Sequence, residues 1–169
     1  MEQYFELADM IYEKRHGAYQ VLAFGIRKGR YFFIVNVGGE WPAAYVEKKP
    51  EDPDDYESLN DVLFNEKHGE DALPHGGLIY GPDDLSRLKR AMKRLPGFDG
   101  ILERKYWGWD YSHFGDYCTY KEEENLEEED LLVKHSVGEI YEKNILPFID
   151  YMSKKFANAN DWKKEEEKL

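Results

Sequence analysis

The sequence lacks the features of several common protein classes. Cys118 is the only cysteine in 169 residues, so we expect neither an intrachain disulfide nor a cysteine-rich zinc site. No apolar run approaches the roughly 18–20 residues that a membrane span needs. The first residues lack the basic and apolar segments of a secretory signal. These absences predict a cytoplasmic protein that does not bind a membrane.

Positive charge is also scarce. Lys and Arg number 23 against 35 Asp and Glu, and the formal net charge is -12. A surface this acidic repels phosphate backbones, so we do not expect generic nucleic-acid binding. One basic island interrupts the pattern: Arg87, Lys89, Arg90, Lys93, Arg94, Arg104 and Lys105. The island is either a solvated helix face or a local contact for a phosphate or an acidic partner.

Aromatic residues, in contrast, are abundant: 13 Tyr, 9 Phe and 4 Trp. This much apolar area is typical of a folded protein rather than a disordered one. The length suits one well-packed core. We therefore predict a single domain over 1–169, with a frayed tail at 158–169.

The clearest strand pattern lies in the first third of the chain. Segments 18–26 and 31–37 are rich in β-branched and aromatic residues, and a polar turn containing Gly29 joins them. This pattern predicts a β-hairpin, and 42–46 predicts a third strand beside it. With further strands expected near 76–80 and 106–112, the fold class is α+β, with a small antiparallel sheet.

Two or three helices are predicted to cover this sheet. Residues 2–15 have a nearly helical apolar period, and a second helix is expected to start at Asp83. Ser136 and Glu139 form a capping box that opens a long C-terminal helix, in which Pro147 predicts a kink. Between the sheet and the second helix, 47–71 is predicted to be a long loop with about one helical turn.

Histidine, aspartate and glycine concentrate in two blocks, Pro74 to Tyr80 and Trp107 to Tyr117. Glycine next to His and Asp among aromatic residues brings backbone close to polar side chains in a dry setting. The blocks supply four candidate catalytic residues, His75, Asp110, His113 and Asp116, and four candidate ligand-binding residues, Gly76, Gly77, Tyr80 and Trp109.

The second block alternates as a strand does, with aromatics on one face. An unbroken strand would turn His113 away from Asp110 and Asp116. Convergence of the three side chains therefore requires a bend near Ser112 to Gly115, for which Gly115 can adopt a positive φ.

The chemistry of these residue types is limited. A carboxylate beside an imidazole makes a general base or a metal-ligand pair, and His75 offers a second imidazole. The backbone N–H groups of Gly76 and Gly77 could hold an anion. A divalent metal is compatible with the set, although no His-Glu-x-x-His spacing is present. The alternatives are a hydrogen-bonded network that only stabilises the fold, and a contact for a protein partner.

The blocks also resemble a known family. Ala43-Ala44-Tyr45-Val46, the His-Gly-Gly block and the Asp-x-x-His-x-Gly-Asp block occur in the order found in an uncharacterised family of small phage- and prophage-encoded proteins. The resemblance spans about residues 18–120 in scattered blocks and implies a phage-type setting without a mechanism. Two positions depart from the family: Ile79 replaces a typical Thr, and Trp41 a frequent His.

Two functional hypotheses follow. The first is a phage-type accessory protein that binds, and in one version hydrolyses, a small polar ligand at the His-Gly-Gly and Asp-x-x-His-x-x-Asp residues. The second is an acidic, non-enzymatic inhibitor or adaptor that binds a host protein through 47–57 and 122–130. Acidic runs are also common as plain solubilising loops.

Overall fold

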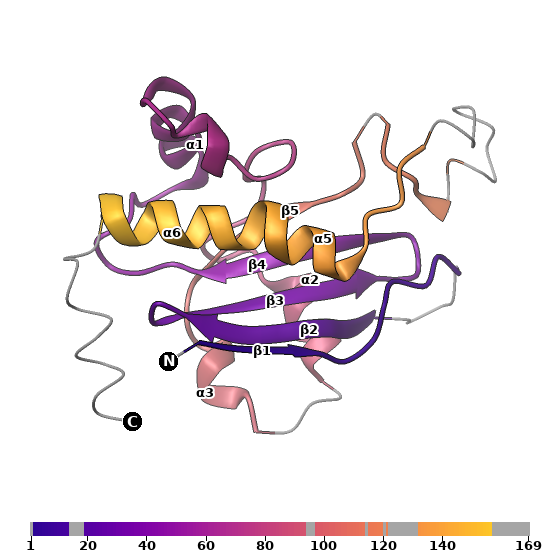
Figure 1. Ribbon diagram of the computed structural model, residues 1–169. Helices are drawn as coiled ribbons and strands as arrows, with labels where there is room; N and C mark the ends of the chain where they lie inside the picture. Colours follow the sequence, from indigo (N-terminus) through magenta and orange to yellow (C-terminus); the bar gives the residue numbers. More distant parts are fainter. Residues whose placement is uncertain are drawn as a thin grey trace.

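A five-stranded antiparallel sheet, with its strands in sequence order, forms the centre of the protein (Figure 1). The computed structural model describes residues 2–13, 19–93, 97–113, 115–119, 121 and 132–156, with Asp99 described by its backbone alone. The strands are β1 (Gln3–Glu6), β2 (Tyr19–Arg27), β3 (Arg30–Val37), β4 (Trp41–Glu47) and β5 (Tyr106–Asp110). The prediction of an α+β fold with a small antiparallel sheet is confirmed.

Helices cover both faces of the sheet. They are α1 (Tyr56–Asn65), α2 (Ser86–Met92), α3 (Asp99–Leu102), α5 (Val137–Ile140) and α6 (Leu146–Lys155), with a 3₁₀ turn at Glu70–Ala72 and a π turn at Tyr141–Ile145. Figure 1 shows α5 and α6 lying across the front of the sheet, with α2 and α3 behind it. No helix within the described ranges is long and apolar enough to cross a membrane.

Strand alternation divides the buried side chains into two cores. In β5, Trp107 and Trp109 belong to the core beneath α6, and Trp109 meets Phe148 edge to face at 5.5 Å between ring centroids. Tyr106 belongs to the opposite core, beneath α2 and α3. Asp110 shares the parity of Tyr106, so it leaves the strand on the face opposite the two tryptophans.

The predicted meander is present as β2, β3 and β4. Arg27 pairs with Arg30, so the hairpin loop is only Lys28 and Gly29. Both loop residues have positive φ, 47° and 75°. A two-residue loop of this kind matches the right-handed twist of the strands that it joins.

The predicted N-terminal helix is wrong, because residues 3–6 instead form the edge strand β1. Tyr4 pairs with Gly25 of β2, and its ring stacks on Tyr141 at 3.9 Å. A Cβ at Gly25 would lie 2.0 Å from the Gln3 carbonyl oxygen, so only glycine admits β1 at this distance. Pairing with an available sheet edge outweighs a weak helical period.

Two further predictions between 47 and 80 need correction. The expected loop contains a full helix, α1, whose first turn is capped by Asp55 accepting from the Ser58 N–H at 2.7 Å. Residues 76–80 are not a strand of the sheet, and only Tyr80 bridges to Gly108. The Asn60 side chain takes both backbone groups of Leu78, at 2.9 Å each, and so occupies them in place of a neighbouring strand.

The second helix begins at Ser86 rather than Asp83, and its start has no side-chain cap. The helix ends at Met92, before the stop expected at Pro96-Gly97. The predicted tail at 158–169 and the acidic run at 122–130 lie outside the described residues.

The C-terminal helix is present and starts at the predicted cap, where Ser136 accepts from the Glu139 N–H at 3.1 Å. It continues past Pro147, and its irregularity is the π turn that immediately precedes α6. Proline has no N–H for the carbonyl one turn earlier. The Asn144 side chain donates to that carbonyl, on Lys143, at 3.2 Å.

A buried ion pair anchors the connection that leaves β4. Arg30 forms two bonds to Asp52, at 2.6 and 2.8 Å, and the side chains are 1% and 0% exposed. Asp52 also accepts from the Trp107 indole N–H at 3.1 Å and the Lys49 backbone N–H at 2.9 Å. The pair therefore joins β3, β5 and the segment after β4.

We predict that Arg30→Met destabilises the protein by about 3–5 kcal/mol, because it leaves the Asp52 carboxylate buried without a counter-charge. Urea unfolding of the variant measures the loss. Arg90→Met, which removes an exposed cation, is the control and is expected to cost about 1 kcal/mol or less. Equal losses in the two variants would contradict a structural role for the buried pair.

Candidate functional site

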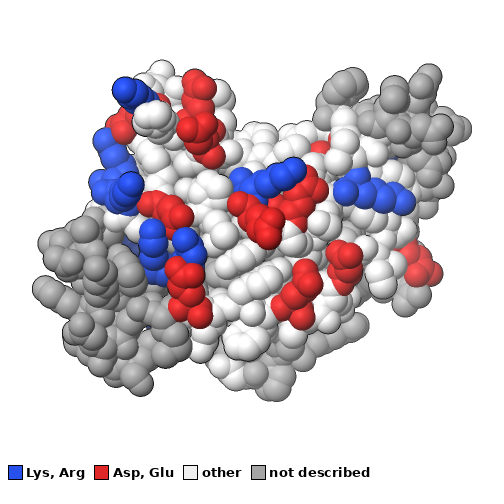
Figure 2. Space-filling view, viewed as in Figure 1, with Lys and Arg blue, Asp and Glu red and all other residues white. Residues whose placement is uncertain are grey.

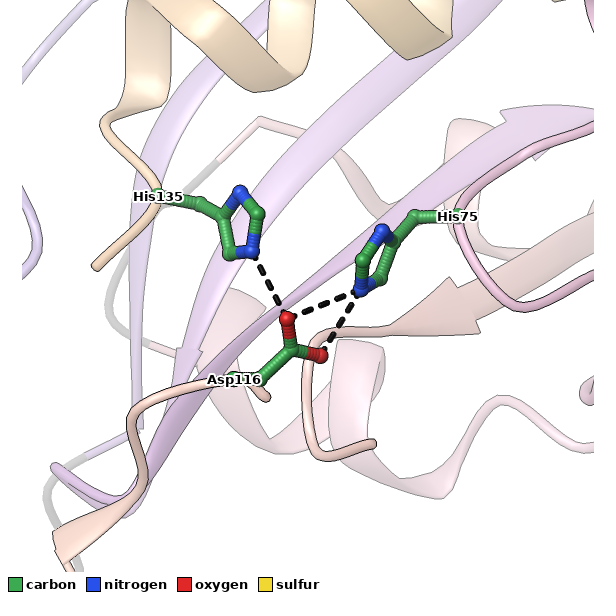
Figure 3. Close-up of side chains that lie close together, drawn as sticks. All are labelled: His75, Asp116 and His135. Carbon is green, nitrogen blue, oxygen red and sulfur yellow. Dashed lines mark hydrogen bonds and ion pairs between the residues drawn. The ribbon is translucent and has the colours of Figure 1, made fainter. Parts of the chain in front are cut away.

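Three side chains from distant parts of the chain meet beyond the end of β5. His75 comes from the turn before Leu78, Asp116 from the bend that follows β5, and His135 from the residues just before α5 (Figure 3). Backbone bonds place the last two together: the Val133 N–H donates to Gly115, and the Tyr117 N–H donates to Val133. The local pairing of 115–117 with 133 therefore delivers His135 to Asp116.

Asp116 is the centre of the cluster and is 2% exposed. His75 Nε2 lies 2.9 and 2.8 Å from its two carboxylate oxygens, and His135 Nε2 lies 2.7 Å from Oδ1. The His113 backbone N–H donates to Oδ2 at 3.0 Å. The buried Lys121 ammonium holds the same bend by donating to the carbonyls of His113 and Asp116, at 2.5 and 2.9 Å.

This environment shifts the protonation of two members in opposite directions. Burial alone would raise the pKa of Asp116, but hydrogen bonds from His135, His75 and the His113 backbone outweigh it and hold that pKa well below its usual range. The bond to Asp116 raises the pKa of His135 against the opposing effect of burial. The carboxylate is thus kept ionised, and the imidazolium form of His135 is favoured.

Other contacts fix both imidazole rings. The His75 ring stacks on Tyr111, with centroids 4.8 Å apart and planes within 12°. Tyr111 is itself held by a bond from its hydroxyl to Asn144 at 2.5 Å. His135 Nδ1 lies 3.4 Å from the Glu139 carboxylate, one turn along α5. Each ring therefore presents Nε2 to Asp116 in a set orientation.

His113 lies between this cluster and Asp110. Its Nδ1 is 3.5 Å from Asp116 Oδ2, and its Nε2 is 3.9 Å from Asp110 Oδ1. Buried Nδ1 has no hydrogen-bond partner within the described part of the chain. The bend predicted around Gly115 is present, with φ of 87° at that residue. It turns His113 toward both aspartates without bonding its ring to either.

Asp110 belongs to a separate group on the other face of the sheet. Its carboxylate accepts from the Tyr80 hydroxyl and, at 2.9 Å, from Ser112 Oγ. Arg87 donates to the Tyr80 hydroxyl from α2. Burial and the Asp110 carboxylate raise the pKa of Tyr80. The four predicted catalytic residues thus divide into a bonded pair, His75 and Asp116, an intermediate His113, and a separately satisfied Asp110.

The structure places the predicted ligand-binding residues in different roles. Gly77 donates its N–H to the Pro74 carbonyl at 2.7 Å, so this group closes a turn and does not face an anion. Gly76, with φ of 73°, lies against the His113 ring. Trp109 is completely buried, and its indole N–H donates to the Tyr111 hydroxyl at 3.1 Å. Trp109 is therefore a core residue.

Sequence reasoning missed His135. The available signal was its position directly before the Ser136 cap and four residues before Glu139, where its side chain can reach the first turn of the helix. Nothing local indicates contact with Asp116, since 18 residues separate the two positions. Only the fold brings them together.

The described acidic residues form no continuous patch on the face drawn in Figure 2. Within 47–57, Glu47 and Asp52 are buried. On the face in Figure 2, acidic and basic side chains alternate in small groups.

The cluster offers two imidazole nitrogens and a carboxylate oxygen, all within 4.8 Å of one another. Such a set can share protons or hold a metal ion. Comparison with protein families, with curated proteins and with solved structures found no match. The functional argument therefore depends on the geometry of this site.

We predict a pH-dependent stability contribution from His135 in chelator-treated protein. Because the His135 pKa is higher in the folded than in the unfolded protein, its protonated form stabilises the fold. This stabilisation is fully present below the unfolded-state pKa of about 6.5 and is lost as the pH rises through the folded-state pKa. The lowered pKa of Asp116 acts oppositely: its contribution is present above about pH 3.9 and is lost as the pH falls through the folded value.

Urea unfolding of wild type and His135→Gln, measured at a series of pH values, tests the prediction. The free-energy difference from wild type should be largest between about pH 4 and 6.5 and should shrink at higher pH. His68→Asn, at an exposed histidine, should show no such trend. A difference for His135→Gln that is constant with pH would contradict the prediction.

We also predict that Gly76→Ala displaces the His113 ring. A Cβ at Gly76 would lie 2.5 Å from two ring atoms, whereas at Gly97 it would meet no described atom within 4 Å. Because both glycines have positive φ, alanine at either costs about 1–2 kcal/mol of backbone strain. Imidazole NMR resonances should therefore shift for His113 in Gly76→Ala and stay in place in Gly97→Ala. Unchanged His113 resonances in Gly76→Ala would contradict the contact.

Proposed function

We propose that the protein binds a divalent transition-metal ion through His75 Nε2, Asp116 and His135 Nε2, and that this site holds a small polar ligand for hydrolysis. The observation that supports the proposal is the convergence of two oriented imidazole nitrogens on one buried carboxylate. The three residues come from separate segments, and each is held by contacts that do not involve the other two.

The donor spacing fits an ion after a small adjustment. The nitrogen-to-oxygen distances are 2.7–2.9 Å, and donors around a tetrahedral zinc ion lie about 3.3 Å apart. If the nitrogen and oxygen donors moved apart by about half an ångström, a metal ion could take the place of the protons that they now share. The His75 side chain, which is 31% exposed, has room for a shift of this size.

The surroundings also fit. Metal-binding histidines usually donate their other ring N–H to a carboxylate or carbonyl, and Glu139 occupies that position for His135. Two imidazoles and one carboxylate suit zinc and neighbouring transition metals better than magnesium or calcium, which prefer oxygen donors. Three protein donors leave coordination positions for a ligand, and a bound ion of this kind supplies Lewis-acid chemistry for hydrolysis.

His113 is placed to serve the same ligand. Its ring is 34% exposed and lies beside Asp116 without a hydrogen bond to it. An imidazole in this position can exchange a proton with a ligand held at the cluster. Gly76 leaves room for the ring, because a Cβ at that position would lie 2.5 Å from two of its atoms.

The phage-type setting suggested by the family resemblance stays a prediction. So does the alternative function of an acidic inhibitor or adaptor that binds a host protein. The burial of Glu47 and Asp52 removes two charges from the surface that this alternative would use.

Zinc titration by calorimetry tests the proposed function. Wild type should bind one ion per chain, and His75→Asn and His135→Asn should each lose at least about 100-fold in affinity. Glu139→Gln should lose about 10- to 100-fold, as expected for an outer hydrogen-bond partner. His68→Asn keeps the histidine count of the variants equal and should bind as wild type does. Equal affinities in wild type and His75→Asn would overturn the proposal, provided that circular dichroism shows both folded.

A further inference from the structure

A hollow of about 380 Å³ lies at the opposite end of β5 from the histidine cluster. It is lined by Glu47, Lys48, Lys49, Pro50, Arg104 and Lys105. We call these residues the basic groove. Four of the six carry positive charge, although the formal net charge of the protein is -12. The groove is therefore locally positive on a negatively charged protein.

The pairing of β4 with β5 builds the groove from two distant segments. Glu47 pairs with Tyr106, and the Lys48 N–H donates to the Lys105 carbonyl at 2.8 Å. Beneath them, the buried Asp52 accepts from Arg30 and from the Lys49 N–H. The backbone of Lys48 and Lys49 is therefore held by its pairing with the start of β5 and by its bond to Asp52.

The only carboxylate that lines the groove in the described structure is already engaged. Glu47 is 4% exposed. It accepts from Arg104 Nη1 at 3.0 Å and from the Tyr31 backbone N–H at 3.2 Å, and it lies 3.3 Å from Lys49 Nζ. One buried negative charge cannot balance four cations, so Lys48 and Lys105 leave the groove electropositive.

We propose that the basic groove binds the phosphate group of a small molecule. Its volume lies near the lower end of the range for small-ligand sites, about 300–1,000 Å³. Lysine and arginine bind phosphate through charge-assisted hydrogen bonds, which are about twice as strong as neutral ones. A long polyanion such as nucleic acid would extend beyond the groove over a protein whose formal net charge is -12, whereas a small phosphate would contact only the cations.

The cations on α2 do not join this groove. Arg87 bonds to the Tyr80 hydroxyl, and the Arg90 guanidinium lies over the Tyr19 ring, 4.0 Å from its centroid. The basic island of the sequence therefore separates in space, and Arg104 and Lys105 are joined instead by Lys48 and Lys49. The groove is also independent of the proposed metal site, since β5 runs between them.

Calorimetric titration with inorganic pyrophosphate tests the proposal. The protein is treated with a chelator and dialysed, so that a metal at His75, Asp116 and His135 cannot contribute. Wild type should show saturable binding that weakens with added salt. The double variant Lys48→Gln/Lys105→Gln should lose at least about 10-fold in affinity, because it removes two charge-assisted contacts.

The control is Lys67→Gln/Lys89→Gln, which changes the net charge equally at two exposed lysines outside the groove. Its affinity should stay within about two-fold of wild type, since distant exposed charges are screened. Equal losses in the two double variants would overturn the proposal in favour of bulk attraction. Absence of saturable binding by folded wild type at millimolar pyrophosphate would also overturn it. Neither outcome bears on zinc binding.

Discussion

The pairing of β5 with β4 is the interaction on which the rest of the structure depends. It joins residues 43–47 to 106–110 in a continuous antiparallel register. This register sends Trp107 and Trp109 into one core and Asp110 to the other face of the sheet. It also sets the two ends of β5, so that the basic groove forms where the strand begins and the histidine cluster forms beyond its last residue. A shift by one residue would exchange the faces and remove both.

The buried carboxylate of Asp116 brings the residues of the candidate site together. A carboxylate with little exposure is costly unless hydrogen bonds satisfy it, and here His75, His135 and the His113 backbone all do so. The same contacts that stabilise the ion also aim two imidazole nitrogens at one point. The cluster therefore contributes to the fold and, in our proposal, provides the donors for a metal. The basic groove differs in that its single buried carboxylate leaves positive charge unbalanced.

Local patterns predicted the elements whose signals are local. The hairpin follows from two alternating strands around a turn with Gly29, and the start of the C-terminal helix follows from Ser136 and Glu139, which act within one helical turn. The N-terminal segment was predicted to be helical because its apolar spacing is nearly helical. It became a strand because Gly25 leaves room for a neighbour at the sheet edge. Gly25 lies about twenty residues further along the chain, and its effect acts through backbone pairing. The apolar periodicity of the N-terminal segment does not report on such a contact.

The sequence by itself determined the α+β class, the meander, the C-terminal helix and the bend at Gly115, because each depends on residues close together in the chain. It also indicated His75 and Asp116 as polar residues in glycine- and aromatic-rich blocks. Only the tertiary structure decided that they bond to each other, that His135 joins them, and that Asp110 pairs with Tyr80 instead. These choices depend on which segments the sheet and the loops bring side by side, and no local spacing encodes contacts over tens of residues.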